Sequence, residues 1–102
     1  MCGITGIWHR DGRPVDPRVL DRMTETLAHR GPDDHGTHID GDLGIGHQRL
    51  SIIDLTSAGH QPMPNDDASL WITYNGEIYN YIELREELRS LGVVFRSNCD
   101  TE

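Results

Sequence analysis

The sequence is poor in cysteine, in basic residues and in long apolar runs, and each shortage excludes a class of protein. Its 102 residues include two cysteines, Cys2 and Cys99, which are too few for a disulfide scaffold. Nine Lys and Arg against 17 Asp and Glu give a net charge of −8 without a basic cluster, which argues against nucleic-acid binding. No apolar run approaches the ~20 residues of a membrane span, and the N-terminus lacks the basic segment and apolar core of a signal peptide. These shortages predict a cytoplasmic protein with free thiols that does not bind membranes.

Recognised metal-binding patterns are also missing, although the chain has six histidines. His29, His35 and His38 lie near two aspartates, and zinc sites use such ligands. In a strand, however, His35 and His38 point to opposite faces because side chains alternate with a period of two. No His-Glu-x-x-His segment or paired cysteine motif is present. The sequence therefore predicts no metal site.

The composition that remains is typical of one folded domain with a single modest core. Hydrophobic residues make up 35% of the chain and charged residues 25%. Asp16 and Pro17 have the residue types of a helix N-cap and first helical position. The apolar face of this first helix comprises Val19, Leu20, Met23 and Leu27. A second helix, ended by Gly92, has an apolar face made of Ile78, Tyr81, Leu84, Leu88 and Leu91.

Strands are predicted from alternating and apolar stretches between turn signals. They cover residues 3–9, 35–40, 43–50, 70–74 and 93–96, with residues 51–54 continuing apolar. Ile4 and Trp8 are expected to face the interior, Gly41-Asp42 to form a tight hairpin, and residues 56–69 to form a loop. The order β, α, several β, α, β predicts an α+β fold with a largely antiparallel sheet.

Cys2 follows the initiator methionine directly, and this position suggests a catalytic N-terminus. Removal of Met1 would leave the Cys2 thiol and a free α-amino group on the same residue. An N-terminal amine can act as the general base for its own side chain, so no histidine partner is needed. The alternative is that Cys2 is a small buried hydrophobic residue at the start of a strand.

Two further segments carry residue types suited to substrate binding. Arg49 is a charged planar fork in an otherwise apolar strand, suited to holding a carboxylate, unless it forms an ordinary surface ion pair. Asn75-Gly76 offers a side-chain amide beside a glycine N–H, one way to build an oxyanion hole. The alternative for this pair is a hairpin turn.

Taken together, the segments resemble the N-terminal glutaminase domain of the glutamine-dependent asparagine synthetases and their relatives, the class II glutamine amidotransferases. The match covers essentially the whole chain and shows no departure at a motif position. It rests on Cys2-Gly3-Ile4, His29-Arg30-Gly31-Pro32-Asp33, Gly46-His47 with Arg49 to Asp54, Gln61-Pro62, Asn75-Gly76-Glu77-Ile78-Tyr79-Asn80 and Asp100-Thr101-Glu102.

The resemblance implies an αββα four-layer sandwich of the N-terminal nucleophile hydrolase type. It implies that Cys2 is the nucleophile, that Asn75 and Gly76 form the oxyanion hole, and that Arg49 holds the glutamine α-carboxylate. Asp100 would bind the α-ammonium group. The remaining glutamine-binding positions implied by the resemblance are Leu50, Ile52, Ile53 and Glu77.

The same resemblance implies partners outside this sequence. Family members continue into a synthetase domain that binds ATP and Mg²⁺ and consumes the ammonia, most commonly to convert aspartate to asparagine, although some relatives amidate other carboxylates. Residues 1–102 are then the first part of the amidotransferase domain, with no cofactor of their own and with a homodimer as one assembly to consider. Because residues 97–102 follow the predicted strand 93–96 and end without a closing element, we expect the chain to be truncated. The alternative is a non-catalytic binding module of the same fold, and we expect the isolated piece to be inactive and oligomeric or marginally folded.

Overall fold

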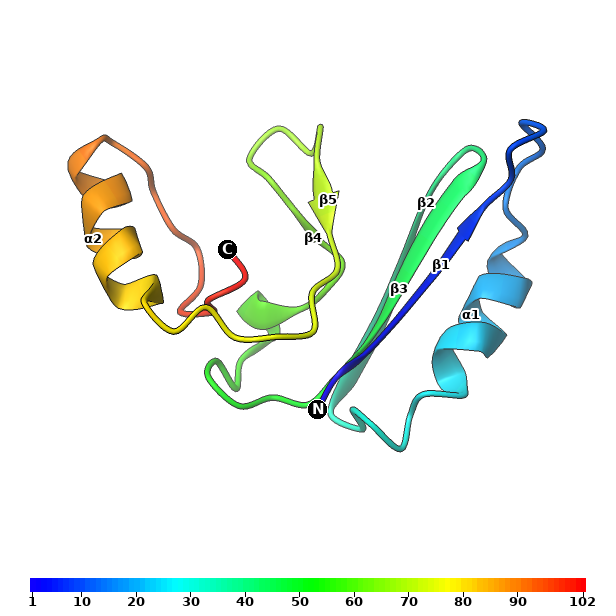
Figure 1. Ribbon diagram of the computed structural model, residues 1–102, viewed down its shortest axis with the longest axis horizontal. Helices are drawn as coiled ribbons and strands as arrows, with labels where there is room; N and C mark the ends of the chain where they lie inside the picture. The colour runs from blue at the N-terminus through cyan, green and yellow to red at the C-terminus, as the bar shows by residue number, and fades with distance from the viewer.

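The computed structural model describes residues 1–102 as two α-helices and two antiparallel sheets. Strands β1 (Gly3–Trp8), β2 (Asp34–Asp40) and β3 (Leu43–Arg49) form a sheet in the order β1-β3-β2. Strands β4 (Met63–Pro64) and β5 (Trp71–Ile72) form a second, two-stranded sheet. The helices are α1 (Pro17–Glu25) and α2 (Tyr81–Ser90), and a short 3-10 helix, η1 (Ser57–Gly59), precedes β4. The predicted α+β class with antiparallel strands is confirmed (Figure 1).

Helix α1 begins where the sequence predicts. Asp16 is the N-cap, and its Oδ1 accepts a hydrogen bond from the Arg18 backbone N–H at 2.9 Å. Hydrogen bonds from the Arg18 side chain and backbone lower the pKa of Asp16. Pro17 occupies the first helical position, where its missing N–H costs nothing. The cap thus fixes the direction in which α1 leaves the loop after β1.

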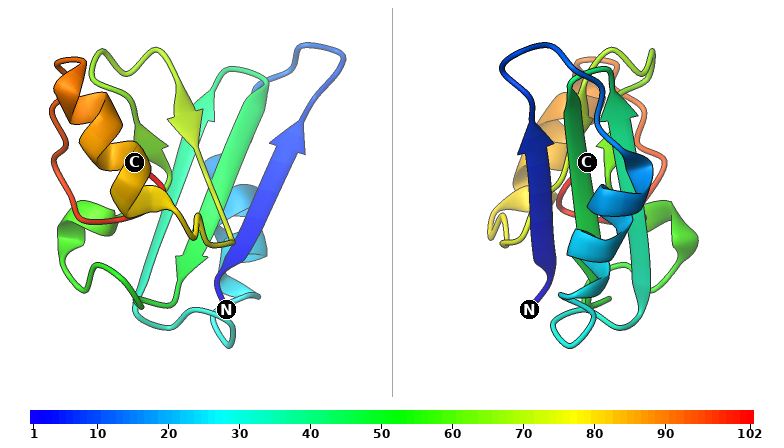
Figure 2. Two further views of the ribbon diagram at one scale, coloured as in Figure 1. Left: turned by 60° about the vertical axis from the view of Figure 1, so that its left-hand side comes forward. Right: turned by 90° about the vertical axis from the view of Figure 1, so that its right-hand side faces the viewer.

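One face of the three-stranded sheet receives α1 on small residues of β3. A Cβ on Gly44 would lie 2.9 Å from the Leu20 side chain, and a Cβ on Gly46 would overlap the Thr24 hydroxyl. Leu20 and Thr24 are consequently fully buried, and the Thr24 hydroxyl bonds to the Thr5 hydroxyl of β1 at 2.8 Å. Figure 2 shows α1 lying along this face. Two of the three largest fully buried side chains of the molecule lie in this contact.

The opposite face of the same sheet carries the β4–β5 hairpin. The His38 ring of β2 stacks on Trp71 of β5 with ring centroids 3.6 Å apart. The hairpin covers β2 and β3 but not β1, so Ile4 and Trp8 are 49% and 66% exposed. The prediction that these two residues face the interior is therefore wrong in this structure. Residues alternating with them, such as Thr5, are the ones that face α1.

Helix α2 lies beyond the hairpin, on the far side of the molecule from α1 (Figure 1). It begins at Tyr81, so Ile78 of the predicted apolar face precedes it, and none of its residues is buried. Its Arg85 guanidinium stacks 5.1 Å from the Phe95 ring centroid and donates to the Cys99 carbonyl at 3.0 Å. Helix α2 is thus held by the irregular segment that follows it. Neither helix is long and apolar enough to cross a membrane.

Two predicted strand assignments need correction. Residues 93–96 form no strand, because the Arg96 and Ser97 N–H groups donate to the Glu102 carboxylate, both at 2.8 Å, instead of to a neighbouring strand. The predicted strand 70–74 is reduced to β5, and its partner β4 lies inside the predicted loop 56–69. Residues 51–54 leave the sheet after Arg49.

Candidate active site

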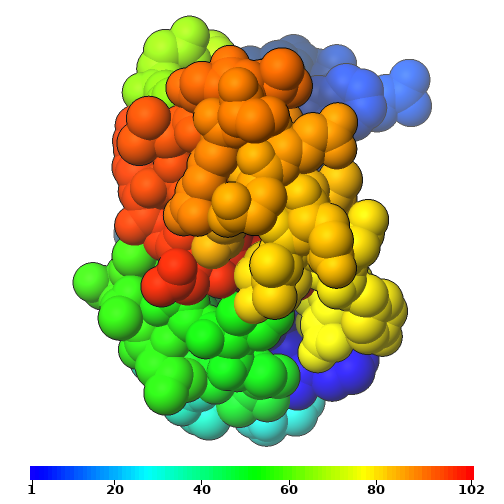
Figure 3. All heavy atoms as spheres, turned by 90° about the vertical axis from the view of Figure 1, so that its left-hand side faces the viewer, coloured from blue at the N-terminus to red at the C-terminus, as the bar shows by residue number.

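A cavity of about 280 Å³ lies where the start of β1 and the end of β3 meet the segments that flank α2. This volume is at the small end of ligand pockets, which run from about 300 Å³ upwards. Every site residue predicted from the sequence lines it: Cys2, Arg49, Leu50, Ile52, Ile53, Asn75, Gly76, Glu77 and Asp100. Figure 3 shows this side of the molecule, with the N-terminal residues in blue beside the yellow and green segments. The structure thus brings together residues that are far apart in the sequence.

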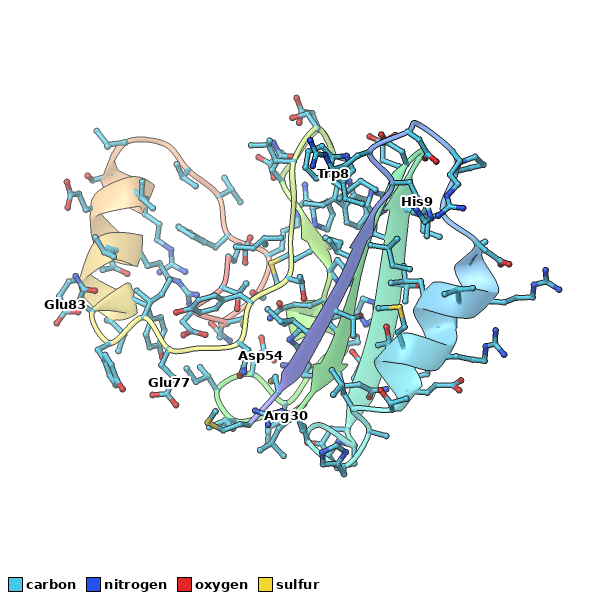
Figure 4. All side chains as sticks on the ribbon, turned by 45° about the vertical axis from the view of Figure 1, so that its right-hand side comes forward. Trp8, His9, Arg30, Asp54, Glu77 and Glu83 are labelled. Carbon is cyan, nitrogen blue, oxygen red and sulfur yellow. The ribbon has the colours of Figure 1, made fainter.

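Cys2 stands one residue before β1, at the floor of the cavity. Its Sγ accepts a hydrogen bond from the Leu50 N–H at 3.3 Å and lies 3.7 Å from the Leu50 carbonyl, so the backbone of Leu50 fixes the position of the thiol. The Arg30 Nε donates to the Cys2 carbonyl at 3.0 Å and fixes the backbone on the other side; Figure 4 shows Arg30 beside the start of β1. Met1 precedes Cys2 and is largely exposed. Cys2 is half-buried at a cavity wall, so it is not the buried apolar residue of the alternative interpretation.

Arg49 is the last residue of β3 and is only 6% exposed. Its Nη1 donates to the Thr56 carbonyl at 2.8 Å and its Nη2 to the Asp54 carbonyl. Gly59 of η1 lies so close to the guanidinium that any Cβ there would overlap it. No salt bridge involves Arg49, so the surface ion-pair alternative is wrong. A buried cation that has no carboxylate in direct contact can still bind an anion in the cavity.

Asn75 and Gly76 follow β5 and lead toward α2, so the hairpin alternative for this pair is wrong. The Tyr74 ring folds back over Gly76, and a Cβ at Gly76 would lie 2.6 Å from the Tyr74 hydroxyl. Only glycine leaves room for this contact. Between residues 74 and 78, side chains from elsewhere in the chain form hydrogen bonds with the backbone of Tyr74 and of Ile78. The Asn75 side-chain amide forms none. Asn75 therefore has donors available to the cavity.

Asp100 approaches from the C-terminal segment. Its Oδ2 accepts a hydrogen bond from the Ile78 N–H at 2.8 Å, three residues before α2 begins. The second carboxylate oxygen contacts only the Cys99 thiol, at 3.7 Å. The carboxylate is thus oriented by the chain around Ile78 while one oxygen stays available, as a cation-binding group requires.

Two cavity residues were missed as site residues from the sequence, although both lie in motifs that it contains. Asp54 accepts hydrogen bonds from the Thr56 hydroxyl at 2.6 Å, the Asn98 N–H at 2.9 Å and the Thr56 N–H at 2.8 Å. These bonds, that from the Thr56 side chain foremost, lower the pKa of Asp54 to about 2. Gln61 bonds to Tyr74 and Thr101. In Figure 4, Asp54 lies with Glu77 in the region between α2 and the three-stranded sheet.

A larger cavity of about 820 Å³ lies elsewhere, between the β4–β5 hairpin and residues 93–96. It contains none of the predicted site residues and no candidate nucleophile. No three His, Cys, Asp or Glu side chains lie close enough to one another to bind a metal ion jointly. The chemistry that the side chains offer is therefore concentrated in the smaller cavity, where thiol, guanidinium, amide and carboxylate groups converge.

The sequence was compared with known proteins. Asparagine synthetase [glutamine-hydrolyzing] 1 of Bacillus subtilis is 44% identical over 105 residues, covering 100% of this chain and 16% of the relative. A protein of the same name from Lotus japonicus is 48% identical over 101 residues, covering 98% of this chain and 17% of the relative. A putative asparagine synthetase of Methanocaldococcus jannaschii is 43% identical, covering 85% and 20%.

This chain therefore spans about a sixth to a fifth of the length of these relatives. The family model of the glutamine amidotransferase domain matches residues 1–102, the whole chain. The side chains of Cys2, Arg49, Asn75 and Asp100 converge on one cavity. All four lie within the region that the family model matches. The chain belongs to the glutamine amidotransferase domain family and is related to the N-terminal part of asparagine synthetases.

Proposed function

We propose that this chain hydrolyses the side-chain amide of glutamine, with Cys2 as the nucleophile, to give glutamate and ammonia. The observation that carries the proposal is the convergence of Cys2, Arg49, Asn75 and Asp100 on one cavity of about 280 Å³. An amino-acid substrate needs an anion holder, a cation holder and a group that polarises the amide carbonyl. The cavity supplies one candidate for each beside the Cys2 thiol.

Substrate binding follows from the charges in the cavity. The guanidinium of Arg49 has unused N–H groups beside the two that donate to backbone carbonyls, and these would hold the α-carboxylate. The free oxygen of Asp100 would accept from the α-ammonium group. With both ends of the amino acid fixed, its side-chain amide can extend toward Cys2. Leu50, Ile52, Ile53 and Glu77 would complete the walls around it.

The chemistry is acyl transfer in two steps. After Met1 is removed, the Cys2 amine takes the thiol proton, and the thiolate attacks the amide carbon of glutamine. The Asn75 amide and the Gly76 N–H would stabilise the oxyanion as it forms. The C–N bond then breaks, ammonia leaves with the proton from the Cys2 amine, and a γ-glutamyl thioester remains. Water hydrolyses the thioester to glutamate and returns the proton to Cys2.

The architecture of the parent protein forms part of the same proposal. In Figure 1 the elements follow in the order α1, three-stranded sheet, two-stranded sheet and α2, which supports an αββα sandwich of the N-terminal nucleophile hydrolase type. Residues 1–102 would form the first part of that domain in a longer, cytoplasmic protein. A following synthetase domain would use the ammonia, with aspartate as the favoured acceptor because of the relatives' names. ATP and Mg²⁺ belong to that domain, and no residue of this chain is assigned to them.

The test is Cys2→Ala in the full-length protein. We expect the variant to produce no glutamate from glutamine while ammonia-dependent synthesis continues, because only the acyl acceptor is lost. Cys99→Ala is the matched cysteine control and should keep glutaminase activity, since Cys99 is within the chain and has no free α-amine to act as its base. Mass spectrometry of the N-terminus completes the test, because retained Met1 leaves Cys2 without a free amine. Undiminished turnover in Cys2→Ala refutes the proposal.

A further inference from the structure

The backbone of Tyr74, immediately before Asn75, is held by two side chains instead of by a sheet. Strand β5 ends at Ile72, so the Tyr74 N–H and C=O have no partners in a strand ladder. The Tyr74 N–H donates to Gln61 Oε1 at 2.7 Å. The Tyr74 carbonyl lies 3.1 Å from His47 Nε2. One residue at the edge of the cavity is thus fixed from both sides.

The surroundings of His47 determine which ring nitrogen carries the hydrogen. It is 0% exposed on β3, and because a carbonyl only accepts, its Nε2 must carry the hydrogen that bonds to Tyr74. Its Nδ1 is buried without a partner, so a second N–H there would be unsatisfied. Burial accordingly lowers the pKa of His47 and keeps the ring neutral. His47 does not line the cavity and reaches it only through Tyr74.

Gln61 extends the same support to the other side of the cavity. It is 5% exposed, and its Nε2 donates to the Thr101 hydroxyl at 3.1 Å while Oε1 holds Tyr74. Thr101 is the neighbour of Asp100. Both ends of the Gln61 amide are therefore occupied by the protein, and this side chain joins the segment of Asn75 to the segment of Asp100.

We propose that His47 and Gln61 are positioning residues for the oxyanion site, acting by fixing the Tyr74 backbone and with it Asn75 and Gly76. The proposal rests on the proposed glutaminase function. Oxyanion donors act when they lie about 2.7–3.1 Å from the developing charge. A misplacement of about 1 Å can cost about 100-fold in rate. Loss of either support should therefore impair the transition state more than glutamine binding.

The test compares two pairs of variants in the full-length protein. His47→Gln keeps an amide nitrogen near the Nε2 position, whereas the shorter side chain of His47→Asn cannot reach the Tyr74 carbonyl. Gln61→Glu keeps an oxygen for the Tyr74 N–H, and the Thr101 hydroxyl can donate to it; Gln61→Met keeps the length but loses both bonds. We expect kcat to fall about 10–100-fold in His47→Asn and Gln61→Met, with KM within about threefold, and to recover largely in the conservative partners.

Two controls separate positioning from general damage. Thr73→Val removes a hydrogen bond from the neighbouring residue to the Gly46 carbonyl and should leave kcat unchanged. Alkylation of Cys2 by iodoacetamide forms no oxyanion, so its rate, followed by mass at Cys2, should be equal in all variants. Folding is checked by circular dichroism.

Each outcome decides between the two hypotheses. A wild type that does not hydrolyse glutamine, or does so independently of Cys2, overturns the proposed function and this inference with it. Normal Cys2-dependent turnover with unchanged kcat in His47→Asn and Gln61→Met overturns the inference alone. The inference alone is also overturned if KM rises as much as kcat falls, or if alkylation of Cys2 is slowed. Loss of folded structure in both variants overturns it as well, because the two residues would then act on stability.

Discussion

Both helices carry an apolar face, more sharply defined in α1 than in α2, and their surroundings differ. Helix α1 buries Leu20 and Thr24 completely against a sheet whose glycines leave room for them. Helix α2 buries no residue, and Leu84 and Leu88 remain 40% and 41% exposed. The difference lies in the partner surface, since α2 faces an irregular segment and α1 faces a sheet. An apolar face becomes a core only where a complementary surface receives it.

The candidate site lies between these two regions and takes residues from both. Cys2 and Arg49 come from the ends of β1 and β3, on the side that α1 stabilises. Asn75, Gly76 and Asp100 come from segments that flank α2. The proposed nucleophile and carboxylate holder thus stand on the better-packed part of the molecule. The proposed oxyanion donors depend on hydrogen bonds from side chains such as Gln61.

The largest effect should come from truncating the core under α1. Leu20→Ala removes a fully buried side chain, and such changes typically cost about 2–5 kcal/mol in the free energy of unfolding. Leu88→Ala in α2 is the matched variant and should cost less than about 1 kcal/mol, because that side chain is already well exposed. Urea unfolding followed by circular dichroism measures both. Equal losses would show that α2 is packed as firmly as α1.

The next effect concerns the side of the site near α2. Asn75→Ala removes a donor that meets full charge only in the transition state, so kcat for glutamine hydrolysis should fall about 10²–10³-fold with KM little changed. Steady-state kinetics with glutamine in the full-length protein provides the measurement. Asn80→Ala is the control, because the Asn80 side chain makes no capping hydrogen bond to α2. A change confined to KM would withdraw the oxyanion role from Asn75.

A smaller effect is expected on the better-packed side of the site. Arg49→Lys keeps the charge but loses the planar fork that is held by the Thr56 and Asp54 carbonyls. The KM for glutamine should rise about 10–100-fold, the range expected for a lost charge-assisted hydrogen bond, with less effect on kcat. Arg96→Lys is the matched control, since Arg96 forms an exposed pair with Asp66. An unchanged KM in Arg49→Lys would contradict the carboxylate-binding role.

The sequence predicted best where local chemistry and the final structure agree. Asp16 and Pro17 define the start of α1 by themselves, and the hairpin at Gly41-Asp42 joins β2 and β3 as expected. The site residues could be named because they lie in short motifs, and the structure places all of them at one cavity. Their roles stay predictions that the kinetic experiments must test.

Long-range pairing explains what the sequence did not predict. Residues 93–96 have the residue pattern of a strand, but the Arg96 and Ser97 N–H groups donate to the Glu102 carboxylate. The alternating pattern of β1 predicts that Trp8 faces the interior. The β4–β5 hairpin does not cover Trp8, and the position of that hairpin depends on residues far from Trp8 in the sequence. The contacts of Gln61 with Tyr74 and Thr101 join residues 13 and 40 positions apart, so no local pattern indicates them.

The smallest effect expected is a pH dependence that arises where the two regions are joined. Asp54 accepts hydrogen bonds from Thr56, near Arg49, and from Asn98, near Asp100, and the bond from the Thr56 side chain leads in lowering its pKa to about 2. In the unfolded chain the pKa of an aspartate is about 3.9. Between about pH 4 and pH 2 the Asp54 carboxylate therefore stays ionised in the folded state, whereas it is protonated in the unfolded state. The stabilisation is therefore complete above about pH 4 and is lost as the pH falls from about 4 toward 2.

Asp54→Asn tests this dependence. The difference in unfolding free energy between wild type and Asp54→Asn should be largest near about pH 5 and should shrink steadily toward about pH 2.5, as urea titrations at each pH would show. Glu87→Gln, on the exposed face of α2, makes the same change in charge without comparable hydrogen bonds and should show a flat difference. If the difference in unfolding free energy between wild type and Asp54→Asn is independent of pH, the ionised Asp54 carboxylate does not stabilise the contact between the two regions. In that case the alignment of Arg49 with Asp100 must depend on the backbone alone.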